Sequence, residues 1–243
     1  MDYSFLQCGE GALTVHLGDG IDPAINRRVT ALQGAIGSAG LRGITDLIPA
    51  YADLTVCYDC TVISAKALQR QLRRLLDSLS VAGQDRRRVF RLPVCYGGDY
   101  GPDLDFVCHH SGLSAQEVIA LHSAPDYLIY MLGFLPGFAY LGGLDPRLHT
   151  PRLDSPRTCI PAGSVGIGGA QTGVYPLASP GGWQLLGRTP VSVFDRQRQE
   201  PILYRAGDLV HFVPISPAEY EEIAQAVAAG TYTVQVEEVP VCD

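Results

Sequence analysis

The sequence predicts an α+β fold in two parts. In the first part, short strand-like segments alternate with two long segments whose apolar residues recur at helical spacing, which is typical of a sheet covered by helices. In the second part, strand-like segments outnumber helical ones, as they would in a small barrel. The length of 243 residues accommodates both parts, and a hydrophobic fraction of 47% with a charged fraction of 18% is ordinary for a soluble globular protein.

Residues 1–88 are predicted to form the first domain. Its helices begin clearly, because Pro23 stands in the first turn of one and Ser64 caps the other. Each helix has one apolar face, formed by Ile25, Val29, Leu32 and Ile36 in the first and by Leu68, Leu72, Leu75, Leu76 and Leu79 in the second. The predicted order is strand 12–17, helix 22–38, strands 44–49 and 53–58, helix 64–79 and strand 89–95 at the junction. This β-α-β-β-α-β order is a ferredoxin-like arrangement.

Residues 89–243 are predicted to form the second domain. Two short helices come first, and the second of them carries a capping box of Ser114 and Glu117. A later helix begins at Ser216 with Pro217 in its first turn. The predicted helices are residues 104–110, 114–122 and 216–229, and the predicted strands are residues 127–132, 191–194, 201–204, 209–213 and 231–239.

A Gly- and Pro-rich stretch, residues 131–190, is where we expect the functional site. It holds 12 of the 27 glycines and 8 of the 17 prolines, yet it does not repeat and is interleaved with aromatic side chains, which favours ordered turns and short strands over a linker. Four arginines and two aspartates give it a local charge of +2 in a chain of net charge −7. Glycines let backbone N–H groups approach a ligand, and arginines bind negative charge, so the stretch predicts an anion-binding surface.

The candidate site residues lie in this stretch and in the helix before it. Arg157 and Arg188 are predicted catalytic cations, and His122 is the acid/base candidate because it ends a helix just before the stretch. The alternatives are that His122 only stabilises the helix C-terminus and that each arginine only holds a loop in place. The ligand-binding candidates are Arg152, Ser164, Gln171, Tyr175 and Ser179. Such a set would bind a carboxylate, a phosphoryl group or a developing oxyanion.

Several other functions are excluded by what the sequence lacks. Lys66 is the only lysine among 18 basic residues, so the chain has no P-loop lysine and no lysine suited to covalent attachment of biotin. Cys57 and Cys60 have redox or metal spacing but no second pair, and the histidines are dispersed, so no metal site is predicted. The acidic balance argues against a nucleic-acid partner. With no signal sequence and no long apolar run, we expect a cytoplasmic protein that does not enter a membrane.

Six motifs, found in one order, carry a family resemblance. They are GFLPGFAY at 133–140, PR at 151–152 and 156–157, IPAGSV at 160–165, QTGVYP at 171–176, SPGGW at 179–183 and GRTP at 187–190. Together they resemble the signature of the 5-oxoprolinase B-subunit family, also described as allophanate hydrolase subunit 1 or as a carboxyltransferase domain of the subdomain C and D type. The resemblance spans nearly the whole chain, with minor departures such as Cys159 and Ile160 before Pro-Ala-Gly.

The resemblance implies a ferredoxin-like first domain followed by a cyclophilin-like β-barrel. It also implies a component that is inactive alone and that, with the C-subunit and the A-subunit of the enzyme, uses ATP to convert 5-oxo-L-proline into L-glutamate. Phosphorylation of the lactam oxygen needs cations around the phosphoryl group and the substrate carboxylate, which Arg152, Arg157 and Arg188 could supply without a P-loop. Two alternatives stay open, a carboxyltransferase component acting on urea or allophanate and an inhibitor of a sensor histidine kinase.

Overall fold

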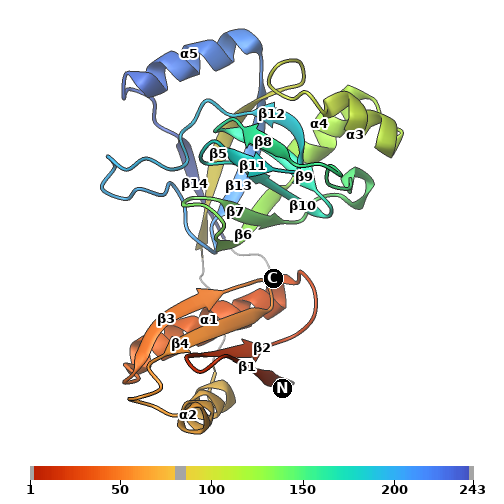
Figure 1. Ribbon diagram of the computed structural model, residues 1–243. Helices are drawn as coiled ribbons and strands as arrows, with labels where there is room; N and C mark the ends of the chain where they lie inside the picture. The colour runs from red at the N-terminus through yellow and green to blue at the C-terminus, as the bar shows by residue number, and fades with distance from the viewer. Residues whose placement is uncertain (1–2, 80–85, 241–243) are drawn as a thin grey trace. The chain divides into compact units, whose positions relative to one another are not determined.

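The computed structural model describes residues 3–79 and 86–240. The chain divides into two compact units, Met1–Gln84 and Asp85–Asp243, each with its own apolar core. Figure 1 shows a sheet with two helices in the first unit and a barrel with short helices in the second. The predicted α+β class, a small helix-covered sheet followed by a β-barrel, is confirmed.

The first unit contains one antiparallel sheet with the strand order β1-β2-β4-β3. Its elements are β1 (Ser4–Cys8), β2 (Ala12–His16), α1 (Pro23–Ala39), β3 (Ile44–Pro49), β4 (Asp53–Tyr58) and α2 (Ala65–Asp77). Side chains of Asp22 and Ser64 cap the two helices by accepting hydrogen bonds from backbone N–H groups of the first turn. Alternate residues of β2 and β4 pack against the apolar helix faces, so this core forms within the unit.

The structure corrects one strand of the predicted first unit. The fourth place in its sheet, beside β2, is taken by β1 and not by residues 89–95. Those residues lie in β5 (Arg86–Tyr96), which belongs to the second unit. Four of the five residues of β1 are exposed, so the strand shows no alternation of buried and exposed positions that a sequence pattern would reveal. The units divide a few residues before the predicted boundary because residues 86–88 pair with residues 238–240 of the second unit.

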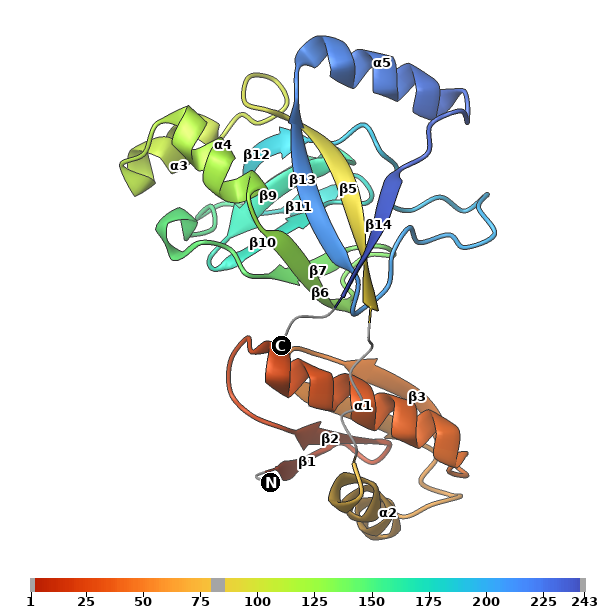
Figure 2. The same cartoon turned by 180° about the vertical axis from the view of Figure 1, so that it is seen from behind.

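The second unit is built on seven strands that close into a barrel. Their order is β12-β9-β10-β7-β6-β13-β5, and pairing of β12 with β5 closes the ring. Their bounds are β5 as above, β6 (Asp126–Leu132), β7 (Ala139–Gly142), β9 (Ser164–Gly168), β10 (Gln171–Val174), β12 (Gln184–Arg188) and β13 (Leu209–Ile215). Outside the ring, β14 (Gln235–Pro240) pairs with β5, and Figure 2 shows β13, β5 and β14 side by side. A separate short pair is formed by β8 (Arg157–Ile160) and β11 (Ser179–Gly181).

Helices and apolar side chains complete the second unit. The helices are α3 (Leu104–Ser111), α4 (Ala115–Ser123), the 3-10 turn η1 (Pro146–Leu148) and α5 (Pro217–Ala228). The predicted capping boxes at Ser114 and Ser216 are both present. Side chains from the barrel strands, among them Leu92, Ile129 and Phe212, fill the interior. In the part of the chain that the structure describes, no helix is long and apolar enough to cross a membrane.

Two predicted strands of the second unit are corrected. Residues 191–194 and 201–204 do not form ladder strands, and only an isolated bridge joins Phe194 to Ile202. Val191, Val193 and Tyr204 are nevertheless buried in the barrel core. These two segments are part of an irregular connection between β12 and β13, and their apolar residues pack against the core. A short apolar run in a sequence looks the same in such a connection as in a strand.

We expect Leu92→Ala to destabilise the barrel strongly. Leu92 is fully buried, and its strand pairs with β13, β14 and β12, so the surrounding structure cannot easily collapse into the cavity. The expected loss is about 2–5 kcal/mol of unfolding free energy. Trp183 is the only tryptophan and lies in this unit, so its fluorescence during denaturant unfolding measures the change. The matched control, Val236→Ala on exposed β14, should lose much less, and equal losses would contradict the assigned core.

Candidate functional site

The Gly- and Pro-rich stretch folds around an aromatic cluster that is distinct from the barrel core. Its buried members are Phe138, Ile160, Tyr175, Trp183 and Leu185. The ring centroid of Trp183 lies 5.5 Å from that of Phe138 and 6.0 Å from that of Tyr175, both in edge-to-face geometry. Such contacts stabilise aromatic pairs beyond the effect of burial alone. Trp183 is therefore central to the local packing of the stretch.

Glycines make room for these rings. A Cβ atom at Gly168 would collide with the indole of Trp183, and one at Gly173 would lie 3.2 Å from its Cζ3 atom. A Cβ atom at Gly181 would lie 2.6 Å from the Tyr175 hydroxyl oxygen. These glycines in β9, β10 and β11 are thus required by the close approach of aromatic side chains to the backbone.

A pocket of about 260 Å³ opens beside the cluster. Its lining is mostly aromatic, Gly and Pro: Phe134, Phe138, Tyr140, Arg152, Pro156, Tyr175, Pro180, Gly181, Gly182 and Trp183. Of these described lining residues, Arg152 alone is charged. An apolar pocket with one well-placed polar group is typical of a small-molecule site.

Phe134 forms the exposed wall of this pocket. Its side chain is 63% exposed, and its ring meets Phe138 edge-on at 5.5 Å. Phe134 has a φ of 65°, a left-handed conformation that is uncommon for a non-glycine residue and that gathers at functional sites. The loop is held by the Gly133 N–H, which donates to the Phe138 carbonyl at 3.1 Å, and by the Tyr204 hydroxyl, which donates to the Gly137 carbonyl at 2.9 Å.

Arg152 places an unneutralised positive charge at the pocket. Its guanidinium carbon lies 5.9 Å from the ring centroid of Trp183, and its Nη2 donates a long hydrogen bond of 3.4 Å to Oε1 of Gln171. No carboxylate in residues 3–79 or 86–240 lies within ion-pair distance of it. The cation–π contact and the amide orient the side chain while leaving its charge available to an anion.

Arg157 is neutralised by a partner outside the stretch. Its Nη2 donates to Oδ1 of Asp103 at 2.7 Å, and its Nη1 donates to the carbonyl of Trp183 at 3.3 Å. The other carboxylate oxygen of Asp103 accepts from the Leu185 N–H at 2.7 Å. This network joins β8 and the start of β12 to the turn before α3, so the structure gives Arg157 a positioning role beside Trp183.

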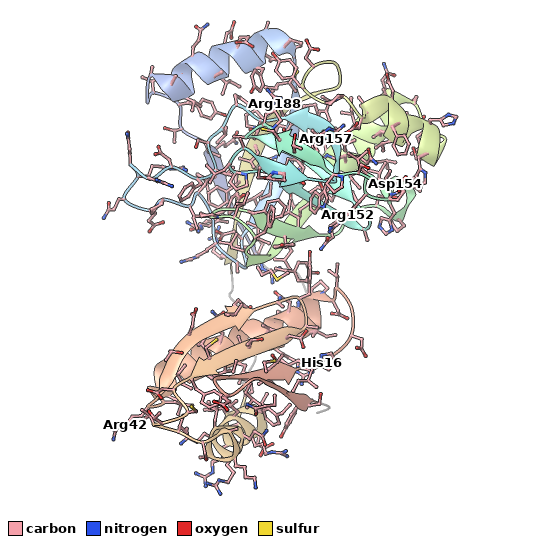
Figure 3. The ribbon with its side chains drawn as sticks, viewed as in Figure 1. His16, Arg42, Arg152, Asp154, Arg157 and Arg188 are labelled. Carbon is pink, nitrogen blue, oxygen red and sulfur yellow. The ribbon has the colours of Figure 1, made fainter. Side chains whose placement is uncertain are left out.

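Arg188 lies elsewhere in the second unit. It ends β12, where it pairs with Cys95 and Ser164, and its buried Nε makes no hydrogen bond among the described residues. Burial raises the pKa of Tyr220 in α5, and the positive charge of Arg188 opposes that rise. In Figure 3, Arg188 is the labelled arginine nearest to α5 and Arg152 is the farthest of the three. The three predicted cations thus have different surroundings: Arg152 lines the pocket, Arg157 pairs with Asp103, and Arg188 lies near Tyr220 of α5.

The remaining ligand-binding candidates are mostly covered. Ser164 and Ser179 are buried, and their hydroxyls lack a hydrogen-bond partner among the described residues. Burial raises the pKa of Tyr175, and the positive charges of Arg152 and Arg157 both oppose the rise. Of the five candidates, the structure thus brings together Arg152, Gln171 and Tyr175 at the pocket side, while the serines lie inside the strand framework.

His122 lies buried beside the barrel core. It is 0% exposed, and its ring stacks on Phe212 at a centroid distance of 4.9 Å. Nδ1 is 2.8 Å from the Tyr96 hydroxyl, and Nε2 is 2.8 Å from the Thr172 hydroxyl. Burial lowers its pKa to about 3, so the ring is neutral near pH 7. We therefore correct the predicted acid/base role of His122 to a packing role, since no substrate reaches a fully enclosed imidazole.

The position of His122 had a detectable sequence signal. It follows Val118 by four residues in α4, and both residues are buried on the same helix face. A polar residue at a core-facing helical position indicates a hydrogen-bonded core group more often than a catalytic one. Phe134 and Asp103, by contrast, carried no comparable signal for the pocket wall and for the ion pair with Arg157. In the part of the chain that the structure describes, no cluster of three or more His, Cys, Asp or Glu side chains could hold a metal ion.

Residues 3–204 match the protein family described as carboxyltransferase domain, subdomain C and D. The chain belongs to this family. The family resemblance that the six motifs carry is thereby confirmed.

Two named relatives are similar over most of their length, and one solved structure shares the fold. The chain is 42% identical to the 5-oxoprolinase B-subunit of Bacillus subtilis (strain 168), covering 90% of this chain and 95% of that protein. It is 45% identical to the 5-oxoprolinase B-subunit of Escherichia coli O157:H7, and the match covers 85% of this chain and 93% of that protein. The crystal structure of Kluyveromyces lactis urea carboxylase is 23% identical, covers 98% of this chain and 24% of that one, and superposes with a TM-score of 0.83. The last comparison shows a shared fold.

We expect His122 to make stability depend on pH. Its pKa is about 3 in the folded protein and about 6.5 in the unfolded chain, so below pH 6.5 only the unfolded chain takes up the proton. The free energy of unfolding should therefore fall by up to about 1.4 kcal/mol per pH unit from pH 6.5 towards pH 3, with no such loss above pH 6.5.

Denaturant unfolding at a series of pH values measures this slope. His122→Gln should show a smaller slope because the amide does not titrate, and His109→Gln on the exposed face of α3 should keep the slope of the unsubstituted protein. Identical slopes in all three proteins would contradict burial of a neutral imidazole.

Proposed function

We propose that this chain is the B-subunit of an ATP-dependent 5-oxoprolinase and acts in an assembly with a C-subunit and an A-subunit. The observation that supports it best is similarity over nearly the full length of proteins named as the B-subunit of 5-oxoprolinase. A second support is the pocket, which combines aromatic walls with a cation that lacks a carboxylate partner in the described structure.

The proposed reaction must activate a poor electrophile. Attack of the lactam oxygen on the γ-phosphorus of ATP forms an O–P bond, breaks the bond to the β–γ bridging oxygen and releases ADP. Water then adds to the activated carbon, the ring C–N bond breaks with protonation of the amine, and a second water displaces phosphate to leave glutamate. Negative charge on the phosphoryl oxygens and on the substrate carboxylate must be matched by cations.

The chain can supply part of this cationic environment. In our proposal Arg152 and Arg188 contribute the charge, because carboxylates neutralise neither of them within the described residues. Arg157 holds the carbonyl of Trp183 and so keeps the pocket in shape. ATP is a co-substrate of the assembly and is not bound through a P-loop here, since the sequence contains no P-loop lysine. The chain carries no lysine suited to covalent biotin either.

Arg152→Ala should lower turnover of the assembled enzyme by about 10- to 1,000-fold, because one well-placed cationic donor is lost. The measurement is glutamate formation from 5-oxoproline and ATP with the A- and C-subunits present. Arg147→Ala is the matched control, since Arg147 is an exposed arginine of the same stretch whose charge Asp145 already neutralises. Unchanged turnover in Arg152→Ala would remove the role assigned to it. ATP-dependent turnover of urea in place of 5-oxoproline would instead support a carboxyltransferase component.

Arg157→Ala should affect both stability and turnover. Removing the guanidinium leaves the largely buried carboxylate of Asp103 without its charged partner and frees the carbonyl of Trp183. The expected loss is about 1–3 kcal/mol in the free energy of unfolding, measured by denaturant titration. Arg157→Lys, which keeps the charge but not the forked geometry, should recover part of the lost free energy of unfolding. A loss of turnover with no change in stability would point to direct contact with substrate.

A further inference from the structure

The geometry points to a binding site for a small ring-shaped carboxylic acid in the aromatic pocket, with the acid's carboxylate on Arg152. We assign 5-oxoproline as its occupant. The identity of the acid rests on the proposed function, whereas the pocket and its charge do not.

The size of the pocket selects a small ligand. Its volume of about 260 Å³ lies below the roughly 300–1,000 Å³ of pockets that enclose drug-sized ligands. A five-membered lactam acid has nine heavy atoms, about a third of the number in ATP, so a pocket of this size suits the acid better than a complete nucleotide.

The walls of the pocket match a flat ring. Phe134, Tyr140 and Trp183 present aromatic surfaces, and Pro156 and Pro180 add rigid apolar contacts. A lactam ring has two apolar faces and a polar edge, so its faces can pack on the aromatic side chains while its edge stays hydrated or meets a neighbouring protein of the assembly. The side chain of Phe134 is largely exposed, so a ligand in the pocket would cover it and remove apolar surface from water.

The charge of the pocket matches a carboxylate. Arg152 is its single charged residue within the described lining, and it donates one of its five guanidinium N–H groups to Gln171 over a long 3.4 Å. A guanidinium fork binds a carboxylate through two parallel hydrogen bonds. Two other arginines of the stretch are already paired, Arg147 with Asp145 and Arg157 with Asp103, and Arg188 does not line this pocket. Arg152 is the arginine that an incoming carboxylate can pair with at this pocket.

The test compares 5-oxoproline with 2-pyrrolidinone, the same ring without the carboxylate. Calorimetric titration of the full chain should show that 5-oxoproline binds at least about tenfold more tightly, because one charge-assisted pair is gained. Arg152→Gln should abolish this preference, and Arg147→Gln should keep it. In the assembled enzyme, Arg152→Gln should raise the KM for 5-oxoproline at least about tenfold and leave the KM for ATP unchanged.

The outcomes separate this inference from the proposed function. If the full chain prefers 5-oxoproline and Arg152→Gln abolishes that preference, the site is supported. This holds even if the assembly does not turn over 5-oxoproline, a result that would remove the proposed function. Normal turnover with an unchanged KM for 5-oxoproline in Arg152→Gln overturns the site and leaves the proposed function standing. A rise in the KM for ATP alone also overturns it. Equal binding of both rings to the unsubstituted chain overturns it as well, since the pocket would then be apolar without carboxylate recognition.

Discussion

Packing of the Trp183 indole against glycine backbone is the contact on which the candidate site depends. A side chain at Gly168 would collide with the ring, and Phe138 and Tyr175 meet it edge-on. The carbonyl of Trp183 accepts from Arg157, and its ring lies beneath Arg152. One residue thus links the strand framework, the pocket wall and the cation. The glycines at this point serve aromatic packing, although in the sequence they suggested backbone N–H groups approaching a ligand.

Residues distant in the sequence determine which arginines of the stretch are paired with a carboxylate and which are not. Its sequence carries a local charge of +2, but this sum says nothing about where the charge lies. Asp103, far earlier in the chain, approaches through the turn before α3 and neutralises Arg157. Arg152 instead contacts the amide of Gln171 and the ring of Trp183, and no carboxylate among the described residues pairs with it. An ion pair restrains geometry and an unpaired cation binds anions, so two arginines of one motif acquire different roles.

Local signals in the sequence predicted much of the fold, and long-range pairing accounts for what they missed. Helix starts at Ser64, Ser114 and Ser216 follow from capping chemistry within a few residues, and the six motifs led to the right family. The place of β5 in the barrel depends on pairing with β12, β13 and β14 from the other end of the chain, which periodicity does not encode. Similarly, Arg152 was predicted as an anion-binding residue from its motif, but the aromatic pocket beside it required the fold.

These features together describe a closely packed aromatic pocket with one available cation, which is the central claim. Trp183 is the single tryptophan of the chain, so its fluorescence emission reports directly on this pocket. Titration of the full chain with 5-oxoproline should change the emission saturably, with a midpoint equal to the dissociation constant from calorimetry, because the ring packs against the indole. Unchanged emission at concentrations that saturate the calorimetric signal would contradict the account, since the acid would then bind away from Trp183.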